Sequence, residues 1–173
     1  MRTRRLSAAL GLMVVAWALS SCEPAGTLPG GGRDNDYLVA RQALETGNYT
    51  LAIARYERLL SQAGDSAGRL RLEYAHSLLR AGDFDKAIAV STGLIDRHDG
   101  SLRASARAVR GTARHQIARQ RIAQGQTGAE TRRLLQAAQA DLATFLETHP
   151  GLDAAGAMAT RARLVAADLA KTG

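Results

Sequence analysis

From Asp34 to His149, apolar residues, mainly alanine and leucine, are interspersed with arginine and glutamine, and no proline interrupts them. These residue types are strong helix formers, and no run of alternating β-branched residues predicts a strand. Glycines separate the helical segments. We therefore predict an all-α fold in which short turns join antiparallel helices. The expected helices lie at about residues 35–46, 49–62, 68–81, 84–98, 101–124, 128–148 and 152–171.

The first 21 residues have a different pattern. Met1 to Arg5 carries three arginines and no acidic residue, and Ala8 to Leu19 is an uninterrupted run of 12 apolar or small residues. A basic start followed by an apolar core too short to span a bilayer is the layout of a secretory signal peptide. We therefore expect residues 1–21 to be removed and to contribute nothing to the fold.

The apolar run ends in Leu19-Ser20-Ser21-Cys22, and Cys22 is the only cysteine in the chain. This sequence resembles the lipobox of bacterial lipoproteins, which implies that Cys22 is acylated and becomes the mature N-terminus. The acyl chains would bury many methylene groups at about 0.8 kcal/mol each, enough for stable membrane anchorage. Glu23, rather than an aspartate, follows the cysteine. By the same resemblance, this favours anchorage in the outer membrane, facing the periplasm.

Residues 22–33 are expected to form the lipidated cysteine and a flexible tether, because two prolines and Gly30-Gly31-Gly32 disfavour regular structure. Removal of three arginines with the signal peptide lowers the formal charge from +7 to +4. This mild excess suits an acidic protein partner or anionic headgroups. Without aromatic stacking positions or a reading helix, it does not indicate nucleic-acid binding. The remaining residues, 34–172, suffice for one helical domain.

The helical domain contains an internal repeat. The segment from Leu44 to Ile53 (LETGNYTLAI) returns 35 residues later, from Leu79 to Ile88 (LRAGDFDKAI). In each copy we expect the glycine to end one helix in the left-handed conformation. The following residue, Asn48 or Asp83, can cap the next helix. Ala52 and Ala87 then fall where two helices must cross closely.

This pattern resembles the tetratricopeptide repeat, a helix hairpin with a period of about 34 residues. Two units, roughly 33–66 and 68–100, match well, although Ser91 stands where an aromatic residue is usual. A third, degenerate unit would pair Val109-Arg110-Gly111 with a helix that ends before Pro150. The resemblance implies an α-solenoid of about three repeats, closed by the helix at 152–171 as a cap.

No catalytic constellation is visible in the sequence. The four histidines are scattered, and none has the spacing of a metal-binding motif. No nucleophile elbow of the Gly-x-Ser-x-Gly type occurs. We therefore expect a protein that is not an enzyme and that carries no cofactor or metal.

Two surfaces are candidate partner sites. In tetratricopeptide-repeat proteins, partner segments lie against the first helix of each unit. By resemblance, this groove would comprise Asp34, Tyr37, Arg41 and Leu44 in the first unit, and Arg69, Leu72, His76 and Leu79 in the second. The second surface is a row of arginines that share one helical face, at Arg103, Arg107, Arg110, Arg114 and Arg121. Either acids on neighbouring helices, Glu130 and Asp141 among them, neutralise this row, or an acidic partner or phospholipid does.

Together these features predict a lipid-anchored adaptor or assembly factor that binds proteins of the bacterial envelope. The layout resembles small tetratricopeptide-repeat lipoproteins of pili and secretion channels, most closely those of the Tad (Flp) pilus. A subunit of outer-membrane protein assembly is an alternative in the same class. A ligand-binding or enzymatic periplasmic lipoprotein is an alternative of another class, and self-association also remains open.

Overall fold

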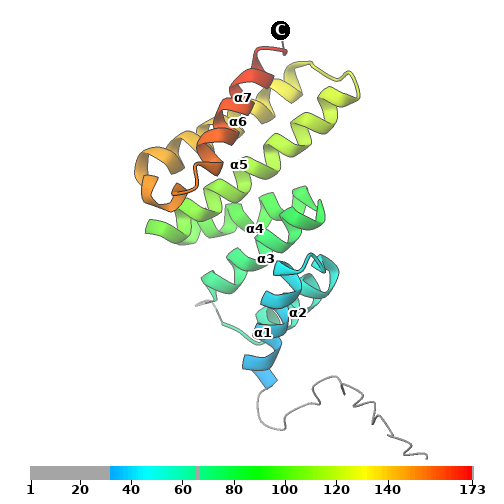
Figure 1. Cartoon of the computed structure of the whole chain (residues 1–173), viewed down its shortest axis with the longest axis vertical. Coiled ribbons are helices and arrows are strands. Elements are labelled where there is room, and N and C mark those ends of the chain that lie inside the picture. The colour runs from blue at the N-terminus through cyan, green and yellow to red at the C-terminus, as the bar shows by residue number, and fades with distance from the viewer. Residues whose placement is uncertain (1–31, 65–66, 173) are drawn as a thin grey trace, which may run out of the picture. The chain divides into compact units, whose positions relative to one another are not determined.

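The computed structural model describes residues 32–64 and 67–172. The signal peptide, Cys22 and nearly all of the tether fall outside these residues, so the interpretation of residues 1–31 stays a prediction. The described residues form α-helices and one short 3-10 helix, with no strand (Figure 1). The elements are α1 (Gly32–Glu45), α2 (Tyr49–Ser61), α3 (Gly68–Ala81), α4 (Phe84–Arg97), α5 (Gly100–Ala123), α6 (Ala129–Thr148), η1 (Pro150–Asp153) and α7 (Ala157–Leu169).

The predicted all-α class is confirmed, and the first six helices begin and end within three residues of their expected positions. The last helix differs, since it was expected to begin at residue 152 and α7 begins at Ala157. Pro150 instead begins the 3-10 helix η1, and Gly156, with a φ of 68°, breaks the helical conformation directly before α7. The Asp153 carboxylate then accepts hydrogen bonds from the amides of Met158 and Ala159, both at 2.9 Å, which stabilises the start of α7.

The repeated turns adopt the expected backbone. Gly47 and Gly82 have φ values of 84° and 86°, a left-handed conformation that disfavours side chains. The Asn48 side chain caps α2 by accepting a hydrogen bond from the Leu51 amide at 3.2 Å. The predicted cap by Asp83 is wrong. Its carboxylate makes no capping bond to α4 and instead pairs with the Lys86 ammonium at 3.0 Å.

Small residues lie where the helices approach one another. Ala52 and Ala87 are fully buried, as the repeat predicts. Gly111 brings α5 against α6 so closely that an added Cβ would lie 3.1 Å from atoms of Asp141 and Leu142, and 3.2 Å from the carbonyl oxygen of Ala138. The third hairpin therefore packs like the first two, although α5 and α6 have 24 and 20 residues against 13 or 14 in α1 to α4.

Each helix packs on the next along the chain, and a second set of contacts joins every other helix. α3 also contacts α5, and α5 also contacts α7. On α1, the side chains of Tyr37 and Arg41 reach Glu73 on α3. The odd-numbered helices therefore share one side of the stack, and the even-numbered helices cover the other. This arrangement of helix pairs is that of a tetratricopeptide-type solenoid.

Candidate functional site

The odd-numbered helices line a groove made of two adjoining hollows. The smaller, of about 370 Å³, is walled by α1, α3 and the start of α5. The larger, of about 810 Å³, lies between α3, α5 and the segment from η1 to α7. His76, Ser105 and Leu152 line both hollows, so the two adjoin at these residues. We call the two hollows together the groove.

Most of the predicted groove residues lie in it. Arg41, Leu44, Arg69 and Leu72 line the smaller hollow, His76 lines both, and Leu79 lines the larger. Tyr37 lines neither hollow, and its hydroxyl donates a hydrogen bond to Glu73. Asp34 is exposed on the first turn of α1. Whether a partner binds at these residues stays a prediction.

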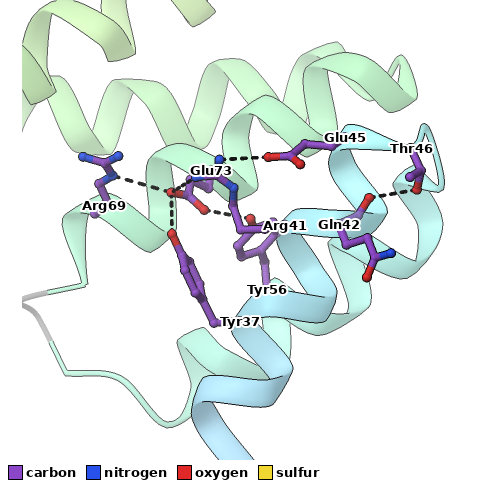
Figure 2. A network of polar contacts seen from close by, with 8 residues as sticks. All are labelled: Tyr37, Arg41, Gln42, Glu45, Thr46, Tyr56, Arg69 and Glu73. Carbon is purple, nitrogen blue, oxygen red and sulfur yellow. Dashed lines mark hydrogen bonds and ion pairs between the residues drawn. The ribbon is translucent and has the colours of Figure 1, made fainter. Parts of the chain in front are cut away.

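A buried carboxylate lies at the wall of the smaller hollow. Glu73 of α3 is only 7% exposed and accepts hydrogen bonds from the hydroxyls of Tyr37 (3.1 Å) and Tyr56 (2.7 Å) (Figure 2). The guanidinium groups of Arg41 and Arg69 lie 3.3 Å and 3.5 Å from the same carboxylate. Burial raises the pKa of the Tyr56 phenol, and the bond to Glu73 raises it further, so Tyr56 is a permanent donor. The two basic residues of this hollow are thus already partly neutralised within the chain.

Sequence reasoning missed Glu73. A lone acid in a helix is usually solvated, and nothing local shows that two tyrosines and two arginines from three helices converge on this one. The available signal was its helical spacing, because Leu70 three residues before it and Ser77 four residues after it share its face of α3. Leu70 packs against the core and Ser77 is fully buried, so this face of α3 is the packed one.

His76 lies at the junction of the two hollows with its surface still accessible to solvent. Desolvation by the surrounding walls lowers its pKa, and although Glu73 opposes this, Arg80 lowers it further. The imidazole is therefore neutral at pH 7, and can both donate and accept a hydrogen bond at the centre of the groove.

The larger hollow has an apolar lining with a few polar groups. The apolar side chains come from several elements, namely Leu79, Phe84, Val109, Phe145, Leu152 and Met158. Thr112, Gln116 and Arg161 are among the polar groups. The last helix was expected only to cap the stack, whereas Met158 and Arg161 make it a wall of the groove. Sequence spacing could not show this, because the true start of α7 depends on the 3-10 turn before it.

The arginine row on α5 is largely neutralised within the chain. Arg110 and Arg114 both bond to Asp141 of α6, which is 4% exposed. Arg121 pairs with Glu130 at 2.7 Å. Arg103 lies 3.4 Å from Asp99 and donates to the carbonyl oxygen of His98. Arg107 is half-buried on the same helix. Contacts within the chain therefore account for four of the five arginines. The groove is a better candidate partner site than this row.

A second buried polar pair lies between α5 and α7. His115 is fully buried, and its Nε2 lies 3.0 Å from the Asp168 carboxylate. Burial lowers the pKa of His115 despite this bond, so the ring is neutral at pH 7. Burial raises the pKa of Asp168, but the bonds from Lys171 and His115 bring it below its usual value. In residues 32–64 and 67–172, no group of histidine, cysteine and acidic side chains is placed to hold a metal ion.

Comparison with known families supports the repeat. A family model described as tetratricopeptide repeat matches residues 43–109, from the end of α1 into α5. Residues 43–109 are thus similar to the tetratricopeptide repeat. The match includes the two hairpin turns and most of the predicted groove residues. No curated protein and no solved structure matches the chain significantly. None of the helices formed by the described residues is long and apolar enough to cross a membrane.

Proposed function

We propose that this chain is a lipid-anchored adaptor of the bacterial envelope that holds a segment of a partner protein in the groove. The observation that carries the proposal is the groove itself. Its two hollows adjoin along the odd-numbered helices. Residues 43–109 are similar to the tetratricopeptide repeat, and such repeats generally mediate protein–protein interaction. An apolar floor with a few polar groups suits a peptide segment that inserts apolar side chains.

The anchor and location rest on the sequence. Leu19-Ser20-Ser21-Cys22 supports acylation at Cys22, and Glu23 supports the outer membrane, facing the periplasm. An adaptor with a short tether would act close to the inner surface of that membrane. A pilus or secretion channel, of the Tad (Flp) type by resemblance of layout, is the machine we propose that it serves. Outer-membrane protein assembly is the alternative within this class.

In-cell crosslinking followed by affinity capture tests the proposal. The full-length protein is compared with Cys22→Ser, which keeps the helical domain and removes the acylated thiol. We expect a secretin, a pilin or another assembly component to be recovered with the full-length protein and lost with Cys22→Ser. Recovery of the chain alone would contradict the adaptor role and favour self-association. Recovery of a partner in equal amounts with both forms would contradict the role of the anchor.

A second candidate is suggested by the size of the larger hollow. At about 810 Å³ it lies within the range of small-molecule sites, about 300–1,000 Å³. A ligand-binding lipoprotein is therefore the alternative from another class. Mass spectrometry of the protein purified under native conditions distinguishes the two, since a small molecule that co-purifies in stoichiometric amount favours the ligand-binding role.

A further inference from the structure

Arg161 of α7 is a partly buried cation that lines the larger hollow and has no acidic partner among the described residues. No carboxylate in the described part of the chain forms an ion pair with it, and its Nε is buried without a hydrogen-bond partner. Its Nη1 lies 3.4 Å from Nδ1 of His115, and Nη2 makes no bond to a described residue. By contrast, the partly buried Arg110 and Arg114 both bond to Asp141. A guanidinium removed from water without a counter-charge is costly, so its presence calls for a reason.

The nearby carboxylates are engaged elsewhere. Asp153 lines the same hollow, but both of its oxygens accept hydrogen bonds from backbone amides at the start of α7. Asp168 bonds to His115 and, at 2.6 Å, to Lys171. Burial lowers the pKa of Arg161, and the nearby charge of Arg119 lowers it further. The described residues therefore leave this cation uncompensated on the wall of a hollow that is open to a ligand.

The surroundings of Arg161 hold its side chain in place. If Nε2 of the neutral His115 ring donates its proton to Asp168, Nδ1 is the acceptor that faces Nη1 of Arg161. Asp168, His115 and Arg161 then form one chain of hydrogen bonds from the α5–α7 contact to the hollow. These hydrogen bonds hold the Arg161 guanidinium in one orientation for binding without supplying a counter-charge.

We propose that the Arg161 guanidinium binds a carboxylate carried by the segment that the groove holds. The inference rests on the proposed function, since it assumes that the occupant is a protein segment. The hollow around Arg161 is lined by Leu79, Phe84, Val109, Phe145 and Met158. The matching segment therefore places an acidic side chain beside a large apolar one. Arg41 and Arg69 in the smaller hollow already share Glu73. Arg80 also lines the larger hollow, but it is exposed and bonds to the Tyr49 hydroxyl. Arg161 is therefore the partly buried cation of the groove that fits this carboxylate.

Peptide selection on the full-length protein tests the inference. The probes are two pools of acetylated and amidated heptapeptides, one with glutamate fixed at the centre and one with glutamine, the other positions being varied. Retained peptides are counted by mass spectrometry for the native protein, Arg161→Gln and Arg163→Gln. Arg163 is the matched control, because it is exposed on the same helix, bonds to Thr160 and does not line the groove.

We expect the native protein and Arg163→Gln to retain the glutamate pool at least about tenfold better than the glutamine pool, as a charge-assisted hydrogen bond predicts. Arg161→Gln is expected to lose this preference while keeping the native unfolding temperature or exceeding it. Equal retention of the two pools, or a preference that survives in Arg161→Gln, overturns the inference and leaves partner binding in the groove intact. Retention of neither pool also overturns it, and in-cell capture then decides separately on the adaptor role.

Discussion

Both oxygens of the Asp141 carboxylate accept hydrogen bonds from the Arg110 guanidinium, from Nη2 at 2.7 Å and from Nε at 2.9 Å. This two-pronged pair joins α6 to α5, and Arg114 adds a third bond to the same carboxylate at 2.7 Å. One buried acid therefore compensates two arginines at the centre of the third hairpin. Burial lowers the pKa of Arg114, and Asp141 opposes this effect.

Loss of this carboxylate should destabilise the fold. Asp141→Asn leaves two partly buried guanidinium groups without a counter-charge, which costs about 3 kcal/mol in the free energy of unfolding. Urea denaturation of the full-length protein measures the effect. Glu130→Gln is the control, because Glu130 is 69% exposed in its pair with Arg121 and should contribute less than about 1 kcal/mol. Equal losses in the two variants would contradict the structural role of Asp141.

Two buried serines should respond in opposite ways to alanine. The hydroxyl of Ser91 on α4 is fully buried and has no hydrogen-bond partner among the described residues, whereas that of Ser77 on α3 donates to the carbonyl oxygen of Glu73 at 2.9 Å. Ser91→Ala removes an unsatisfied polar group and should raise the free energy of unfolding by about 1 kcal/mol. Ser77→Ala should lower it by a similar amount. If Ser91→Ala is less stable than Ser77→Ala, the assignment of the unpaired and the hydrogen-bonded hydroxyl is wrong.

Two helical glycines give a similar contrast. Gly111→Ala places a Cβ against the backbone and side chains of α6 and should cost about 1–3 kcal/mol. At Gly93 on α4, the nearest atoms are those of the flexible Arg97 side chain, which can move away. Gly93→Ala should therefore gain about 0.5–1 kcal/mol from helix propensity. Thermal unfolding of both variants checks the pair, and a stable Gly111→Ala protein would show that α5 and α6 are further apart than described.

The stability of the protein should fall as the pH drops below 6.5. Burial lowers the pKa of His115 and desolvation lowers that of His76, while the ordinary value of both is 6.5. Below that pH the unfolded chain binds protons that the folded chain excludes, so the folded state loses stability, and the full contribution is present above it. Urea midpoints at pH 7.5 and 5.5 measure the loss. His115→Gln and His76→Gln should each show a smaller loss, and unchanged pH dependence in both would contradict the assignment.

The sequence was sufficient to predict most of the helices and the turn within each of the first two repeats. Helix-forming residues and the glycines between them located α1 to α6, and Gly47 and Gly82 marked turns with positive φ. These features depend on neighbours within one hairpin, which a single sequence displays. The same locality explains the failure at Asp83, where Lys86 three residues later competes with the backbone for the carboxylate.

The parts that the sequence did not predict depend on contacts across the stack. Helical spacing placed Arg110 and Arg114 on one face, but it could not show that both reach Asp141. In the same way, the role of Glu73 requires tyrosines from α1 and α2. The position of Arg161 in the groove depends on where α7 begins, which the turn at Pro150 and Gly156 sets. The two residues in such a long-range contact have no fixed separation in the sequence, so a spacing rule cannot find them.

Site-specific photo-crosslinking in the cell tests most directly whether the groove binds a partner. A photoreactive residue at Ser105, which lines both hollows, is compared with one at Asp96, which is exposed on α4 at the other side of the stack. The account predicts a crosslinked envelope protein from position 105 and none from position 96. Crosslinks from position 96 alone, or from neither position, would contradict partner binding in the groove.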